Sequence, residues 1–96
     1  MPLSHASVPI ATPARYMARL CNHFAHRMTV HREAERARIE FPTALCLLQV
    51  TGKRLEMRIE AADAADLDRL EEVVGRHLRQ VASAEAFEVH WVRSDS

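Results

Sequence analysis

The stretch ALCLLQVTGKRLEMRIE, residues 44–60, decides the fold. Residues 54–60 alternate strictly between apolar and charged side chains, which predicts a strand with one buried and one solvated face. Residues 44–50 are apolar at nearly every position, so we expect a strand at the centre of the sheet or at a dimer contact. Thr51–Gly52–Lys53 predicts a tight turn between the two strands.

Three further segments have strand patterns. The runs TVHRE and ARIEFP, residues 29–33 and 37–42, predict a hairpin around a polar turn. ASVPIA, residues 6–11, predicts a short strand at an edge or start, because Pro9 has no backbone N–H to donate. FEVHWV, residues 87–92, predicts a closing strand with its apolar side chains on one face.

Two amphipathic helices separate these strands. The first is expected from Pro13 to Arg27, with Thr12 as the N-cap and proline at the first helical position. The second is expected to begin after Asp63, whose side chain would cap it. Gly75 falls inside the second helix, where it would allow close packing. Apolar residues at three- and four-residue spacings form the predicted buried stripes, namely Met17, Leu20, Cys21, Phe24 and Met28, then Leu67, Leu70, Val74, Leu78 and Val81.

The order β-α-β-β-β-β-α-β predicts an α+β fold of two layers. An antiparallel sheet covered on one face by two helices is the economical way to bury both helical stripes. Ninety-six residues form one domain, 1–96, in which residues 1–6 are expected to be mobile.

Composition narrows the class of protein. Thirteen basic and thirteen acidic residues give a net charge of zero, which disfavours a nucleic-acid binder. No apolar run approaches the roughly 20 residues that span a bilayer, and no secretory signal is present. Two cysteines do not make a disulfide framework, so we expect a cytoplasmic protein with free thiols. The thin core and the doubly apolar residues 44–50 predict a homodimer.

The segment LCNHFAHRM, residues 20–28, holds the most conspicuous chemistry. At about 100° per residue, His23 and His26 are neighbours on the helix, whereas Cys21 lies about 160° from His23 and faces the core. Cys21 is therefore expected to be structural. His77 on the second helix is expected to be a hydrogen-bonded structural residue, and the alternative is a site that it forms with Cys21 or Cys46.

Metal binding is the other reading of these histidines. His23 and His26, with His31 from the following strand, supply imidazoles that first-row transition metals accept. Two surface histidines fall short of three or four zinc ligands, and no CxxC or HExxH spacing is present. We therefore expect no cofactor and only weak, adventitious binding of a transition metal at His23, His26 and His31.

Several segments together carry a resemblance to a known family. LCNHFAHRM, LDRLEEVVGRHLRQVA and FEVHWV resemble the bacterial domain of unknown function 2218, over about residues 11–91. The chain departs from that pattern before Cys46, where the family has a glycine and this sequence has Ala44–Leu45. The resemblance implies the fold and a link to iron or siderophore genes, but it supplies no catalytic residue.

Three functions remain in order of preference. The first is a non-enzymatic binding or interaction module with an unidentified small-molecule or protein partner. The second is a small metal-dependent or Cys/His-dependent enzyme, linked to iron or siderophores. The third is a nucleic-acid binder that uses the arginines of residues 14–38.

Overall fold

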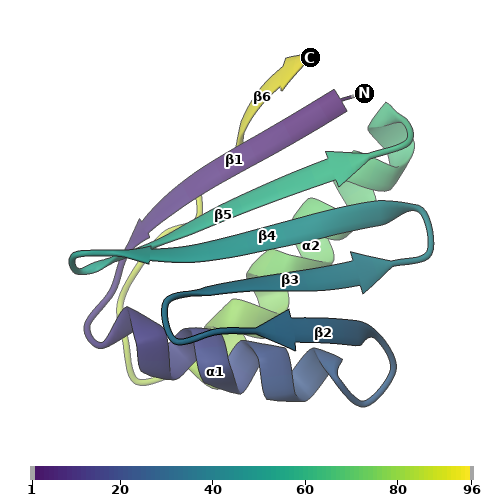
Figure 1. Ribbon diagram of the computed structural model, residues 1–96. Helices are drawn as coiled ribbons and strands as arrows, with labels where there is room; N and C mark the ends of the chain where they lie inside the picture. The colour runs from purple at the N-terminus through teal and green to yellow at the C-terminus, as the bar shows by residue number, and fades with distance from the viewer. Residues whose placement is uncertain (1, 96) are drawn as a thin grey trace.

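The protein consists of one six-stranded antiparallel sheet and two helices, as seen in the computed structural model, which describes residues 2–95. The strands lie in the order β2-β3-β4-β5-β1-β6. Figure 1 shows both helices behind the sheet and the near face uncovered. The predicted α+β architecture and element order are confirmed. In chain order the elements are β1 (Pro2–Pro9), α1 (Pro13–Phe24), β2 (Thr29–Arg32), β3 (Arg36–Phe41), β4 (Ala44–Thr51), β5 (Arg54–Ala61), α2 (Ala64–Val81) and β6 (Val92–Asp95).

The core lies between the sheet and the helices. On β5, alternate residues face it, and Leu55, Met57 and Ile59 are fully buried. The neighbouring β4 contributes Cys46 and Leu48, which stand opposite Ile59 and Met57. The alternation read from residues 54–60 is therefore confirmed, and β4 has the central place expected for a strand with two apolar faces.

The first helix begins as predicted and ends earlier. Pro13 occupies the first turn, but Thr12 has a left-handed backbone with φ +49° and its side chain makes no capping hydrogen bond. The Thr12 carbonyl oxygen instead accepts the backbone N–H of Arg15 at 3.1 Å. The predicted side-chain cap is therefore wrong, because the left-handed conformation turns the chain into the helix. The helix ends at Phe24 rather than Arg27.

The second helix matches its prediction closely. The Asp63 side chain accepts the backbone N–H of Asp66 at 2.8 Å, as an N-cap should. Gly75 lies inside the helix and is buried. A Cβ atom built there would lie 3.8 Å from the Trp91 indole nitrogen, an ordinary van der Waals separation. The packing around Gly75 therefore does not require glycine.

The N-terminal residues differ from expectation. Residues 2–6, expected to be mobile, belong to β1, and residue 1 of that expected segment lies outside the described residues. Ser4 is buried and its hydroxyl donates to the Glu71 carboxylate at 2.6 Å, and Arg93 of β6 donates to the same carboxylate at 2.9 Å. These bonds tie the terminal strands β1 and β6 to α2. The order of residues 2–6 thus comes from partners more than sixty positions away, which local sequence patterns do not reveal.

The closing strand lies further along the chain than predicted. Residues 87–91 form no strand, and β6 begins at Val92. The alternation is nevertheless real, because Phe87, Val89 and Trp91 pack against the core while Glu88 and His90 are exposed. Side-chain alternation predicted which faces are buried but not which backbone groups are paired.

Candidate functional site

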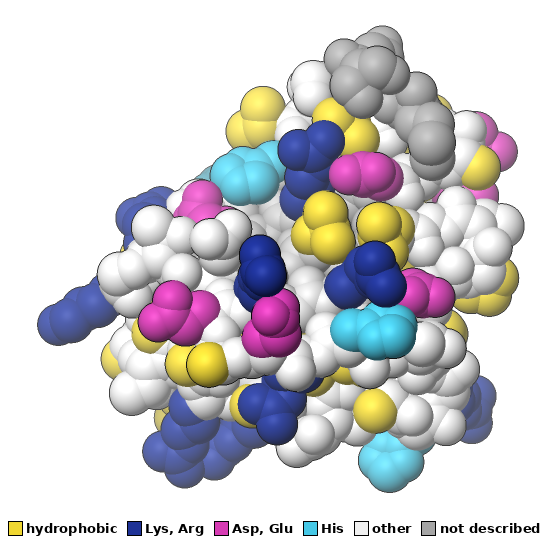
Figure 2. All heavy atoms as spheres, in the orientation of Figure 1, with side chains coloured by type: hydrophobic (Ala, Val, Ile, Leu, Met, Phe, Trp, Pro, Cys, Tyr) yellow, Lys and Arg dark blue, Asp and Glu magenta, His cyan; other side chains and the backbone are white. Residues whose placement is uncertain are grey.

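The open face of the sheet is hollowed into a groove. The groove has a volume of about 900 Å³, crosses β3, β4 and β5 and reaches β1 and β2. Figure 2 shows this face, with hydrophobic side chains near its centre and charged side chains of both signs around them. The groove is lined by His5, His31, Glu33, Arg36, Ala37, Arg38, Leu47, Leu48, Gln49, Thr51, Glu56, Met57 and Arg58.

Strand register arranges the open-face side chains in rows that run across the strands. We call the first the basic row, because arginine or histidine flanks its central leucine on four strands. We call the second the acidic row, because its central leucine lies between two glutamates. The basic row contains His31, Arg38, Leu47, Arg58 and His5, from β2 to β1. The acidic row, two residues along each strand, contains Glu40, Leu45, Glu60 and Leu3.

The two rows lie side by side and neutralise each other. Arg38 is 3.2 Å from Glu40 on β3, and Arg58 is 3.2 Å from Glu60 on β5. Residues two apart on a strand point to the same face and lie about 7 Å apart along it, which brings the long side chains of the two rows together. These pairs are substantially exposed, so each contributes little to stability. They fix instead a pattern of alternating charge on the surface.

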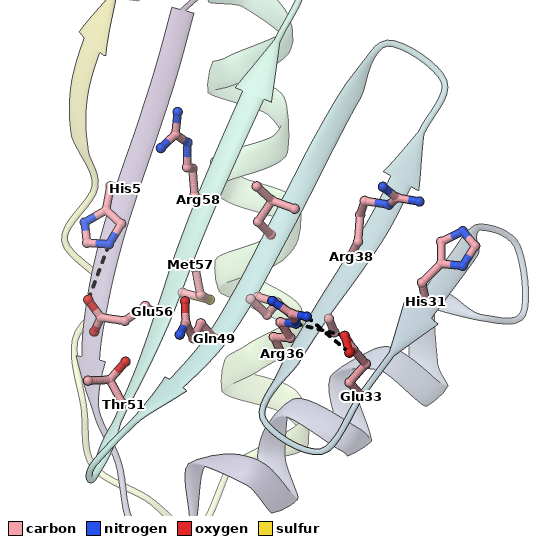
Figure 3. A pocket seen from close by; sticks show the side chains of 13 residues that line it. His5, His31, Glu33, Arg36, Arg38, Gln49, Thr51, Glu56, Met57 and Arg58 are labelled. Atoms are coloured by element: carbon pink, nitrogen blue, oxygen red, sulfur yellow. Dashed lines mark hydrogen bonds and ion pairs between the residues drawn. The ribbon is translucent and has the colours of Figure 1, made fainter.

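The histidines at the ends of the basic row are also paired with carboxylates. His31 Nε2 is 3.0 Å from Glu40, and His5 Nε2 is 3.4 Å from Glu56. Figure 3 shows His5 on β1 and His31 on β2, with Arg58 and Arg38 between them. Because the groove already balances its cations with carboxylates, it suits a partner that carries both signs of charge. A single polyanion such as nucleic acid would need an excess of unpaired cations.

A second cluster lies on the helix side, away from the groove. The His23 and His77 rings have centroids 4.4 Å apart, and the His77 ring also packs against Phe24 at 5.0 Å. His77 Nδ1 lies 2.6 Å from the Val73 carbonyl oxygen, which fixes the proton on Nδ1 and leaves Nε2 as the free acceptor. The contact joins α1 to α2.

The surroundings of the His23 ring disfavour its positively charged form. Partial burial lowers the pKa of His23, and the neighbouring His77 and His26 lower it further. Two imidazoles in contact can share a cation or repel each other when both are protonated. Among residues 2–95, no group of three histidine, cysteine or acidic side chains is placed to hold a metal ion.

Both thiols are buried in the core. Cys21 is 2% exposed and Cys46 is fully buried. Burial raises the pKa of the Cys21 thiol, although Arg32 opposes the effect, and it raises the pKa of Cys46 to about 12, with a smaller contribution from Cys21. A nucleophilic cysteine needs the opposite shift. The structural reading of Cys21 is the one that this environment favours.

The candidate residues from the sequence are therefore divided between separate places. His26 lies in the turn after Phe24, and the His23 ring contacts Phe24 and His77 on the other helix. His31 points to the open face, where it pairs with Glu40 and cannot join His23. The His77 ring contacts His23 and Phe24, and its Nδ1 donates to the Val73 carbonyl oxygen.

Apart from His31, the open-face residues were not among the sequence candidates. The alternation of residues 54–60 gave the outward direction of Arg58 and Glu60. What the pattern lacked was the neighbour on each adjacent strand, which depends on register. The rows appear only when β3, β4 and β5 are aligned.

Comparisons with known proteins extend the description. The chain is similar to the NMR structure of PA4090 from Pseudomonas aeruginosa, with 32% identity, 96% of each chain covered and a TM-score of 0.80. A search of curated proteins finds no match. Among the described helices, none is long and apolar enough to cross a membrane. A family model described as an uncharacterized protein conserved in bacteria, DUF2218, matches residues 5–92, and the chain belongs to this family.

Proposed function

We propose that the protein is a non-enzymatic interaction module. The partner that binds on the open face of the sheet is a second copy of the chain, so that the protein forms a homodimer through this face. The observation that carries the proposal is the composition of this face. Leu45 and Leu47 stand partly exposed at its centre, and paired charges surround them. An apolar centre with a polar surround is the usual anatomy of a protein–protein interface.

The size of the face fits a reversible association. The six strands contain 38 residues in all. At about 3.3 Å per residue and about 4.8 Å between strands, they give a face on the order of 600 Å². Standard interfaces bury about 800 Å² on each partner, and smaller ones are typical of transient complexes. We therefore expect a dimer with micromolar affinity, in equilibrium with a folded monomer.

The chemistry elsewhere supports a binding role over an enzymatic one. The raised pKa values of Cys21 and Cys46 keep both thiols protonated at neutral pH. The His77 Nδ1 proton is held by a backbone carbonyl of its own helix. Free thiols also fit the reducing environment of the cytoplasm, where we place the protein.

Light scattering on matched variants tests the proposal. The double substitution Leu45→Thr/Leu47→Thr is compared with Leu45→Val/Leu47→Val, since threonine and valine have nearly the same shape and both favour strands. At about 100 μM, well above the expected micromolar Kd, wild type and the valine variant should scatter at close to twice the 10.9 kDa chain mass, and the threonine variant as a monomer. Circular dichroism checks that both variants fold. A wild type that is monomeric under these conditions would overturn the proposal.

A further inference from the structure

The basic and acidic rows are complementary to each other, and this has a consequence for how two copies meet. Both rows have a leucine on β4, with a charged residue on β3 and another on β5. The charges are Arg38 and Arg58 in the basic row and Glu40 and Glu60 in the acidic row. A copy that is rotated so that the rows exchange places therefore presents a glutamate to both arginines of the basic row.

We infer that two copies pack face to face about a two-fold axis that runs parallel to the rows and midway between Leu45 and Leu47. The inference rests on the proposed function and specifies the partner's orientation. Rotation about this axis keeps each strand opposite its own counterpart and exchanges the two rows. Arg38 then faces Glu40 of the second copy, Arg58 faces Glu60 of the second copy, and Leu45 faces Leu47 of the second copy.

This arrangement satisfies the geometric requirements of a symmetric dimer. A two-fold interface uses the same patch on both copies, so the patch must be complementary to itself, as these rows are. Packed sheets lie about 10 Å apart with their strands within about 30° of alignment, which lets side chains of the two faces meet. Each arginine would lie between the glutamate of its own strand and a glutamate of the second copy.

Electrostatics disfavours the other face-to-face orientation. An axis along β4 would leave each row opposite itself, with Arg38 facing Arg58 of the second copy and Glu40 facing Glu60 of the second copy. Like charges placed opposite each other across an interface are strongly unfavourable and suppress the wrong pairing. The apolar centre fits both orientations, so the charged rows select between them.

Pairing through the sheet edges is also disfavoured. The edge strands β2 and β6 have four residues each, and both carry arginine. Short, charged edge strands are a common means of preventing edge-to-edge association. The open face is therefore the surface through which this fold can add a second copy with complementary charge.

Charge reversal with complementation tests whether the charged rows of two copies meet, and a single substitution then tests the orientation. The first variant, Arg38→Glu/Arg58→Glu, makes both rows acidic, and the second, Glu40→Arg/Glu60→Arg, makes both rows basic. Alone, each should dimerise at least about tenfold more weakly than wild type, because every facing pair becomes repulsive. An equimolar mixture should form a heterodimer, seen by native mass spectrometry, since every facing pair becomes attractive.

The outcomes separate this inference from the proposed function. Arg58→Glu alone distinguishes the two orientations, because position 58 faces Glu60 of the second copy in the proposed dimer and would face Arg38 of the second copy with the axis along β4. The substitution should therefore weaken the proposed dimer, whereas it would strengthen a dimer with the other axis. If wild type dimerises and the threonine variant does not, but Arg58→Glu dimerises as tightly as wild type or more tightly, the orientation is wrong while the open-face dimer stands. Undiminished dimers of either double charge variant would also refute the orientation.

Discussion

The chain contains only two glycines, and the structure predicts opposite effects for the same substitution at each. Gly75 is inside α2, where alanine is favoured over glycine by about 0.5–1 kcal/mol because it loses less backbone entropy on folding. The new methyl group would lie 3.8 Å from Trp91 Nε1 and 3.9 Å from Arg79 Nη2. Both separations are ordinary contacts, so Gly75→Ala should stabilise the protein by the full propensity gain.

Gly52 is the matched control. It occupies the turn between β4 and β5 with φ +59°, and a Cβ atom there would meet nothing within 4 Å. Space is therefore irrelevant, and the left-handed backbone alone decides the outcome. An L-residue pays about 1–2 kcal/mol in that conformation, so Gly52→Ala should destabilise the protein by about that amount.

Urea denaturation followed by circular dichroism measures both effects. The two variants should differ by about 2 kcal/mol in unfolding free energy, with unchanged m-values. For a domain of this size, the melting temperatures would then differ by about 8–16 °C. Protein concentration must be equal in all samples, because dimerisation adds to apparent stability. A destabilising Gly75→Ala would refute the packing of Trp91 against α2, and a neutral Gly52→Ala would refute the left-handed turn.

Further predictions concern single residues. Thr12→Asn should stabilise the protein by about 1 kcal/mol in urea melts, because asparagine tolerates the left-handed backbone at this position better than threonine does. Native Cys21 and Cys46 should react with a thiol reagent only on unfolding, and a fast phase in the folded state would contradict their raised pKa values. Because the folded-state pKa of His23 is lowered, the unfolded chain binds more protons in mild acid, so stability should fall as pH drops below about 6.5. In the His23→Ala variant, the free energy of unfolding should change less with pH over that range. Calorimetry should show weak Zn(II) binding that requires both His23 and His77, since two imidazoles are fewer than a zinc site needs. Submicromolar affinity would indicate a built site.

The parts of the fold that the sequence predicted are those governed by short-range periodicity. The strand from Arg54 to Glu60 was predictable because side chains alternate with a period of two, and α2 because Asp63 marks its start. The order of residues 2–6 was not predictable, since it depends on β5 and on bonds to Glu71, far along the chain. The end of α1 was placed three residues late, because Ala25–Arg27 continue the helical composition without forming helix.

The candidate chemistry was harder to predict than the fold. A helical wheel relates His23 to other residues of its own helix, so it suggested His26. The contact with His77 depends on how α1 crosses α2, and no periodicity within either helix encodes that crossing. Burial of the thiols was predictable, because Cys21 lies on the same stripe as Met17 and Leu20.

The rows of the open face were partly predictable from the sequence. The turns β3–β4 and β4–β5 are two residues long, Pro42–Thr43 and Gly52–Lys53, and a two-residue turn fixes the register of the strands it joins. Once those turns are known, counting outward places Arg38 and Arg58 beside Leu47. A shift of one residue would send these side chains into the core, where unpaired charge is excluded. The charges and leucines of the proposed dimer all belong to this three-stranded segment, residues 36–61. The interface is therefore set by two local turns, and only His5 and Leu3, each at one end of its row, depend on the long-range pairing of β1.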